Sequence, residues 1–193
     1  MSMPSSFQDT DLTLTLAADI AAQVQVLGQQ VARLGAGLIA TAESCTAGLI
    51  AAALTDMPGS SAWFSRGYVT YANQAKAEML GVSDLVLARE GAVSEKVAGQ
   101  MALGALQGQD VLLTLAVSGI AGPDGGTPDK PVGTVCFGWA VRWPMLGDEP
   151  LLRTETRHFQ GDRAAIRLQT VRHALHGGLR LLQQVRHDQP LVG

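Results

Sequence analysis

Apolar residues recur every three or four positions over residues 11–34, and glycines stand just beyond them at 35 and 37. This spacing puts the apolar side chains on one face of a helix, which the glycines end. A second stripe of the same period covers residues 162–186, with an aspartate at its start as the N-cap. The polar residues 1–10, ahead of the first stripe, are expected to form a disordered tail.

Between these two helices, short apolar runs alternate with segments of helical composition. The predicted strands are residues 37–42, 63–71, 111–117, 132–141 and 153–159. The predicted shorter helices are residues 46–54, 74–80 (capped by Asn73) and 94–106, with a helix or turn at 83–90. This alternation, followed by two adjacent strands, is typical of an α/β fold with a mixed sheet and helices on both faces. Neither a repeat nor a long linker divides residues 11–187, so we expect a single domain.

The composition narrows the class of protein. Of the 193 residues, 47% are hydrophobic and 16% are charged, and the net charge is −3. These values are typical of a globular chain and argue against a nucleic-acid partner. The sequence has no apolar stretch long enough to span a membrane, no secretion signal and only two cysteines, so we expect a cytoplasmic protein. A mean hydropathy of +0.16 favours a homo-oligomer.

His173 and His176 stand three residues apart on the last predicted helix, a spacing that zinc sites use. No cysteine or carboxylate stands beside them in the sequence. We therefore interpret the pair as solvated helix surface and expect no metal site.

Polar or glycine-rich residues follow three of the predicted strands. These junctions are Glu43-Ser44, Tyr71-Ala72-Asn73 and Ser118-Gly119. Sites in α/β folds gather at the carboxyl edge of the strands. If the three junctions share that edge, they form one pocket.

The first junction leaves no room for a loop, so Glu43, Ser44, Cys45 and Thr46 meet the start of a helix. The free N–H groups and the dipole of a helix start favour negative charge. Ser44 is therefore a candidate nucleophile beside an oxyanion or phosphate site. The simpler alternative is that Ser44 or Thr46 only caps the helix.

A serine nucleophile needs a base, and no histidine precedes residue 158. A lysine can replace histidine when burial lowers its pKa, which makes Lys76 a candidate, and Tyr71 could relay the proton or hold the alkoxide. The alternative is a solvated helix lysine and a strand-end aromatic residue. Cys45 is a rival nucleophile, because a helix start lowers the pKa of a thiol. Neighbouring side chains point in different directions, so only one of Ser44 and Cys45 can face the pocket.

Short-chain dehydrogenases also use serine, tyrosine and lysine, but this chain lacks their dinucleotide fingerprint after the first strand. The segment 118–126 contains four glycines and could bring backbone N–H groups close to an anion or a carbonyl oxygen. The segment Gly59-Ser60-Ser61 could do the same. Both segments are equally consistent with ordinary turns.

Taken together, these segments resemble the CinA C-terminal domain family over roughly residues 27–182. The motifs that carry the resemblance are Glu43-Ser44-Cys45-Thr46-Ala47-Gly48, Pro58-Gly59-Ser60-Ser61-Ala62-Trp63-Phe64, Gly67-Tyr68-Val69-Thr70-Tyr71-Ala72-Asn73, Lys76, Gly91-Ala92-Val93-Ser94 and the stretch from Ser118 to Gly126. The resemblance implies a three-layer α/β/α sandwich with a mixed, mostly parallel sheet.

The same resemblance implies a nicotinamide-nucleotide amidohydrolase that needs neither a metal nor a cofactor. Its substrate would be a small-molecule nucleotide, nicotinamide mononucleotide, and its products nicotinic acid mononucleotide and ammonia. The family's catalytic residues fall on Ser44, Tyr71 and Lys76. The residues expected to bind the substrate are Glu43, Cys45, Thr46, Gly48, Ser60, Ser61, Asn73, Ser118, Gly119 and Gly122.

Many relatives have glycine where this chain has Ala47, so the added methyl group could crowd the pocket. The longer N-terminal domain of full-length relatives is not part of the sequence, which favours a stand-alone deamidase. The alternative function is a non-catalytic nucleotide-binding or regulatory module of the competence/damage-inducible family. The net charge of −3 argues against direct binding to DNA.

Overall fold

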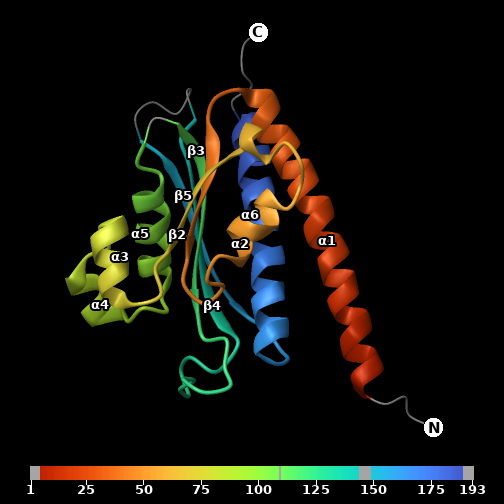
Figure 1. Ribbon diagram of the computed structural model, residues 1–193. Coiled ribbons are helices and arrows are strands. Elements are labelled where there is room, and N and C mark those ends of the chain that lie inside the picture. The colour runs from red at the N-terminus through yellow and green to blue at the C-terminus, as the bar shows by residue number, and fades with distance from the viewer. Residues whose placement is uncertain (1–4, 109, 144–148, 189–193) are drawn as a thin grey trace.

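The computed structural model describes residues 5–108, 110–143 and 149–188, and it places a five-stranded sheet between two layers of helices (Figure 1). The helices are α1 (Ser5–Leu34), α2 (Leu49–Thr55), α3 (Asn73–Leu80), α4 (Asp84–Glu90), α5 (Glu95–Ala105) and α6 (Arg163–Asp188), with a 3-10 turn η1 at Ser60–Ala62. The strands are β1 (Leu38–Glu43), β2 (Phe64–Val69), β3 (Val111–Gly119), β4 (Thr134–Val141) and β5 (Leu151–His158). The expected three-layer sandwich is confirmed.

The sheet has the strand order β2-β1-β3-β4-β5. β1 is parallel to both β2 and β3, whereas β4 is antiparallel to both β3 and β5. Glu43, at the end of β1, pairs with Val69 of β2 and Val117 of β3. The carboxyl ends of these three strands therefore meet at one edge of the sheet, where the three polar junctions were expected.

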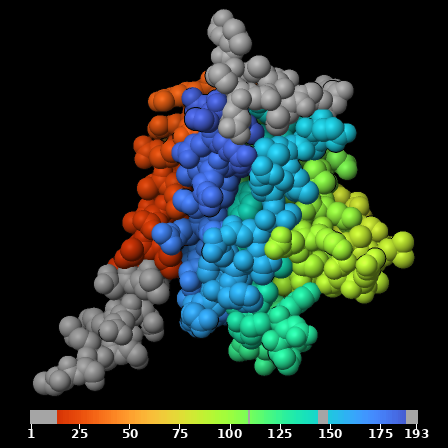
Figure 2. Space-filling model, turned by 180° about the vertical axis from the view of Figure 1, so that it is seen from behind, coloured from red at the N-terminus to blue at the C-terminus, as the bar shows by residue number. Residues whose placement is uncertain are grey.

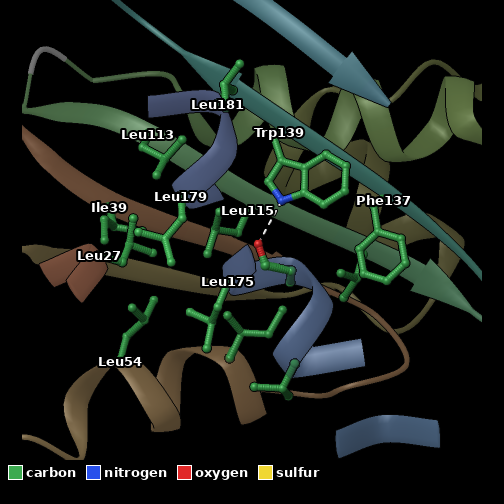
Figure 3. Packing of buried hydrophobic residues seen from close by; sticks show 14 of the residues in the cluster. Leu27, Ile39, Leu54, Leu113, Leu115, Phe137, Trp139, Leu175, Leu179 and Leu181 are labelled. Carbon is green, nitrogen blue, oxygen red and sulfur yellow. Dashed lines mark hydrogen bonds between the residues drawn. The ribbon is translucent and has the colours of Figure 1, made fainter. Parts of the chain in front are cut away.

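Each face of the sheet carries its own apolar core. The helices α1, α2 and α6 cover one face, and α3, α4 and α5 cover the other (Figure 1). Seen from behind, α6 lies between α1 and β5 (Figure 2). Leucines and aromatic rings of β3 and β4 pack beneath α6, where Trp139 Nε1 donates to the carbonyl oxygen of Ala174 at 2.8 Å (Figure 3). A Cβ at Gly177 would lie 2.2 Å from this indole, so glycine lets α6 pack directly on the ring.

Two boundaries differ from the sequence prediction. α1 begins at Ser5, so residues 5–10, which were expected in the tail, belong to the helix. These residues include neither proline nor glycine, and nothing in them stops the helix. Asn73 is the first residue of α3 and not its cap, because the N-cap position falls on Ala72. None of the described helices is long and apolar enough to cross a membrane.

Side-chain caps mark the starts of the two later helices, and the one at Asp162 agrees with the prediction. Ser94 Oγ accepts a hydrogen bond from the N–H of Val97 at 3.3 Å at the start of α5. Asp162 Oδ1 accepts one from the N–H of Ala165 at 2.8 Å at the start of α6. These side chains satisfy N–H groups that the first turn of a helix leaves free.

Candidate active site

Glu43 is fully buried and builds the turn that follows β1. Its Oε2 accepts hydrogen bonds from Thr46 Oγ1 at 2.7 Å and from the N–H groups of Gly48 at 2.9 Å and Ile50 at 3.0 Å. Its Oε1 accepts one from the N–H of Ala51 at 2.8 Å. The carboxylate thus occupies the start of α2, where a substrate anion was expected. Glu43, Thr46 and Gly48, which were expected to bind substrate, form the framework of this turn, and none of the three lines the cavity described below.

The turn holds Ser44 against Lys76. Lys76 Nζ lies 3.1 Å from Ser44 Oγ and also donates to the carbonyl oxygens of Thr70 at 2.8 Å and Tyr71 at 3.2 Å. The N–H of Ser44 donates to the carbonyl oxygen of Val117 at 3.1 Å, which ties the turn to β3. The candidate nucleophile and the candidate base are therefore in hydrogen-bond contact, as the chemistry requires.

Lys76 is only 1% exposed, and its hydrogen-bond partners in the described part of the chain are uncharged oxygens. Burial lowers the pKa of its ammonium group below the ordinary 10.5, and the neighbouring Cys45 opposes this shift. A neutral amine carries a lone pair that can accept the hydroxyl proton of Ser44. The burial rules out the alternative of a solvated helix lysine.

Cys45 is the weaker of the two candidate nucleophiles. It is 5% exposed, and burial raises the pKa of its thiol to about 12, with the charge of Glu43 adding to the rise. A thiol with such a pKa is protonated at neutral pH and reacts slowly. The start of α2, which was expected to lower this pKa, is already occupied by the Glu43 carboxylate.

Tyr71 contributes its main chain to the site. Its carbonyl oxygen accepts the hydrogen bond from Lys76 Nζ, whereas its side chain is 62% exposed at the rim of the cavity. Its hydroxyl forms no hydrogen bond with Ser44 or Lys76 in the described part of the chain. The side chain thus lines the cavity without the hydrogen bond to Ser44 or Lys76 that a proton relay requires.

A cavity of about 280 Å³ lies at this edge of the sheet. Its lining includes Ser44, Cys45, Tyr71 and Lys76, then Ala92 and Val93, then Ser118, Gly119, Ile120, Ala121, Gly122, Asp124 and Gly125, and finally Arg163. The three strand-end junctions thus contribute to one pocket, as expected. A larger hollow of about 510 Å³ between β5 and α6 contains no comparable pair of nucleophile and base among its lining residues.

Three residues expected at the site lie elsewhere. Ser60 and Ser61 belong to η1, ahead of β2, and the parallel pairing of Phe64 with Ile39 puts this turn at the amino edge of the sheet. That edge is opposite the cavity. Asn73 is exposed on α3 and does not line the cavity. The structure therefore does not bring Ser60, Ser61 or Asn73 together with Ser44 and Lys76 at the cavity.

Ala47 stands in the left-handed region of the backbone, with φ of 50°. A side chain costs free energy in this conformation, whereas glycine adopts it freely. The steric cost of a positive φ explains why glycine is favoured at position 47. Ala47 does not line the cavity, so its methyl group does not crowd the pocket.

Arg163 is a cavity residue that the sequence pattern did not indicate. This residue opens α6, lines the cavity, and donates from its guanidinium to the carbonyl oxygen of Gly122 at 2.7 Å. It places a positive charge in the lining of the cavity. Its one sequence signal was its position directly after the predicted cap, Asp162, which does not by itself indicate a site.

His173 differs from its prediction as solvated surface. Its Nε2 lies 3.1 Å from Glu155 Oε2, and its ring packs edge-on against Phe137 with the centroids 4.7 Å apart. The side chain is therefore half-buried between α6, to which it belongs, and strands β4 and β5. Among the residues that the structure describes, no group of three or more histidine, cysteine or acidic side chains is placed to hold a metal ion.

The fold and the site define an α/β/α protein with a serine–lysine pair buried at the carboxyl edge of its sheet. The family model for the CinA C-terminal domain matches residues 21–182. The chain therefore belongs to the CinA C-terminal domain family, as its motifs implied.

Individual relatives are similar over most of this chain. It is 53% identical over 142 residues to the nicotinamide-nucleotide amidohydrolase PncC of Enterobacter agglomerans, covering 74% of this chain and 83% of that protein. It is 51% identical over 153 residues to a CinA-like protein of Akkermansia muciniphila, covering 79% of this chain and 34% of that longer protein. The crystal structure of the competence/damage inducible protein CihA from Agrobacterium tumefaciens matches with a TM-score of 0.78 and 44% identity, covering 86% of this chain and 96% of that one.

Proposed function

We propose that this protein hydrolyses the carboxamide of nicotinamide mononucleotide to nicotinic acid mononucleotide and ammonia, with Ser44 as the nucleophile. The observation that carries the proposal is the 3.1 Å contact between Ser44 Oγ and the buried Nζ of Lys76. The choice of substrate is supported by the relative from Enterobacter agglomerans, which is named a nicotinamide-nucleotide amidohydrolase.

In the first half of the reaction, Ser44 Oγ attacks the carboxamide carbon while the neutral amine of Lys76 takes the hydroxyl proton. The carbon–nitrogen bond of the tetrahedral intermediate then breaks. Lys76 returns the proton to the departing nitrogen, which leaves as ammonia. Ser44 now carries the nicotinate mononucleotide as an ester, and Lys76 is neutral again.

In the second half, a water molecule attacks the ester carbon and Lys76 accepts a proton from it. The bond between that carbon and Ser44 Oγ breaks, and Lys76 returns the proton to the serine oxygen. Nicotinic acid mononucleotide leaves, and the free enzyme is restored. One group that gives and takes a proton serves both halves, because the two steps are chemically the reverse of each other.

The oxyanion of both intermediates needs hydrogen-bond donors. The start of α2 is not available, because Glu43 accepts hydrogen bonds from its N–H groups. The N–H of Ile120, in the glycine-rich loop, donates to Thr134 instead. The N–H of Cys45 forms no hydrogen bond to another residue in the described part of the chain and directly follows the nucleophile, so we assign the oxyanion to it.

The remaining lining supports a mononucleotide. Arg163 is a cationic partner for the phosphate, to which a guanidinium can donate two parallel hydrogen bonds. The exposed ring of Tyr71 offers a face for the pyridine ring. The volume of about 280 Å³ is close to the lower end of the usual range for small-molecule sites, roughly 300 Å³.

The test is ammonia release from nicotinamide mononucleotide by the purified protein, with the nucleotide product identified by chromatography. The proposal predicts nicotinic acid mononucleotide and ammonia in equal amounts. Binding of the nucleotide without ammonia release contradicts the proposal and favours the non-catalytic module.

A further inference from the structure

Two separate segments form opposing walls of the reaction cavity. The connection between α4 and α5 supplies Ala92 and Val93, and the loop after β3 supplies Ile120, Ala121, Gly122, Asp124 and Gly125. The loop projects below the α3–α4 layer in both overall views (Figures 1 and 2). The gap between these two walls limits what the cavity can hold.

Two hydrogen bonds join the walls. Ser118 Oγ, at the base of the loop, donates to the carbonyl oxygen of Ala92 at 2.7 Å. Lys130 Nζ, at the far end of the loop, donates to the carbonyl oxygen of Glu90 at 2.9 Å. Between them, residues 123–129 are exposed, whereas Lys130 is half-buried. Lys130 is therefore the point at which the exposed part of the loop is attached to the opposite wall.

The residues next to Lys130 support its hydrogen bond to the carbonyl oxygen of Glu90. A tight turn presents it, because the N–H of Thr127 donates to the carbonyl oxygen of Lys130 at 2.9 Å. Gly91 follows the tied carbonyl of Glu90 with φ of 76°, and a Cβ there would lie 3.6 Å from the ammonium nitrogen of Lys130. The Glu90 carboxylate is held by Lys96 at 2.6 Å, and the positive charge of Lys130 also lowers its pKa, after the larger effect of Lys96.

We propose that Lys130 is a positioning residue that sets the spacing between the glycine-rich loop and the Ala92–Val93 wall, and thereby the affinity of the cavity for its substrate. It acts through the loop and touches no reacting atom. The claim that this cavity binds the substrate rests on the proposed function, whereas the attachment of the loop does not.

The test compares three variants with the wild type. Lys130→Met removes the hydrogen bond to Glu90 and keeps the aliphatic side chain. Lys130→Arg restores a cationic donor. Lys96→Met is the matched control, because Lys96 binds the same glutamate through its carboxylate and not through the carbonyl that faces the loop. For ammonia release from nicotinamide mononucleotide, Lys130→Met is expected to raise KM about tenfold, the worth of one charge-assisted hydrogen bond, with kcat within about twofold of wild type.

Lys130→Arg and Lys96→Met are expected to keep KM near the wild-type value. A fall in kcat at unchanged KM for Lys130→Met, or an equal rise in KM for Lys96→Met, overturns the proposal.

A second measurement is independent of activity. Amide hydrogen exchange over residues 120–130 of the free protein is expected to be faster in Lys130→Met than in the wild type, and unchanged in Lys96→Met. If the wild type releases no ammonia, the proposed function fails while this exchange still decides whether Lys130 holds the loop. Equal exchange in Lys130→Met and the wild type overturns the proposal whatever the activity.

Discussion

The ammonium nitrogen of Lys76 lies 3.1 Å from the hydroxyl oxygen of Ser44, although 32 positions separate the two residues in the sequence. Ser44 stands on a turn built around the buried carboxylate of Glu43, and Lys76 stands on α3, in the layer on the other face of the sheet from α2. The contact therefore joins the two layers at the carboxyl edge of β1. Lys76 can act as the base for Ser44 only if its buried ammonium group loses a proton near neutral pH.

Replacing Lys76 by methionine is expected to lower kcat for ammonia release by about 10²- to 10⁴-fold, the usual contribution of a general base. Methionine fills similar space without a proton acceptor. Lys76→Arg serves as the control for charge, because it keeps a cation that does not deprotonate near neutral pH, and it should be equally inactive. Activity in either variant close to that of the wild type contradicts the role of Lys76 as the base.

The lowered pKa of Lys76 also predicts how stability depends on pH. Between the lowered value in the folded protein and the ordinary 10.5, the unfolded chain binds more protons at this site, so the free energy of unfolding rises with pH. Below the folded-state pKa, the folded protein bears the full free-energy cost of burying the charged ammonium group. In urea denaturation between pH 7 and 9, the free energy of unfolding is expected to rise more steeply for wild type than for Lys76→Met.

The comparison stops at pH 9 because Cys45 opposes the trend at higher pH. Its pKa is raised from 9.0 to about 12, so it contributes stability that is lost as pH climbs above the unfolded value. Parallel curves for wild type and Lys76→Met below pH 9 would contradict a folded-state pKa low enough for Lys76 to act as a base near neutral pH.

Two substitutions of Tyr71 distinguish a role of its hydroxyl in proton transfer from a role of its ring in substrate binding. Tyr71→Phe is expected to keep kcat within about twofold, because the hydroxyl forms no hydrogen bond with Ser44 or Lys76, whereas the side chain lines the cavity. Tyr71→Ala is expected to raise KM by about tenfold through loss of ring contact. Steady-state kinetics on both variants test this. A large fall in kcat for Tyr71→Phe would restore the hydroxyl as a proton relay.

The left-handed conformation of Ala47 predicts a stabilising substitution. Ala47→Gly is expected to raise the free energy of unfolding by about 1 kcal/mol, since glycine avoids the steric cost of the positive φ. Gly48→Ala is the opposing control, because Gly48 has φ of 95° and an added methyl group should destabilise the turn. Thermal unfolding measures both. A lower free energy of unfolding for Ala47→Gly than for the wild type would contradict the claim that the backbone at Ala47 is strained.

Much of this architecture could be predicted from periodicity. The stripes over 11–34 and 162–186, the glycines after the first stripe, the helix start near Ser94 and the cap at Asp162 depend on neighbouring residues alone, so they can be predicted without knowledge of the tertiary structure. The start of α1 was placed too late, because the polar composition of residues 5–10 is compatible with both a tail and a helix.

The errors at the site came from relationships that a sequence does not display. Ser60 and Ser61 have the composition of an anion-binding turn, but the parallel register of β2 puts them at the wrong edge of the sheet. Glu43 was placed at the start of α2 correctly, yet its four hydrogen bonds consume the donors that a ligand would have used. Arg163 reaches the cavity only because the final helix returns to the sheet.

The central claim is that Ser44 is the nucleophile, and the most direct test is ammonia release from nicotinamide mononucleotide by Ser44→Ala beside Cys45→Ala. Ser44→Ala is expected to lose activity by at least about 10³-fold, and Cys45→Ala to stay within a few-fold of the wild type, because the Cys45 thiol is protonated at neutral pH. Retention of activity by Ser44→Ala, or its loss only in Cys45→Ala, contradicts the account.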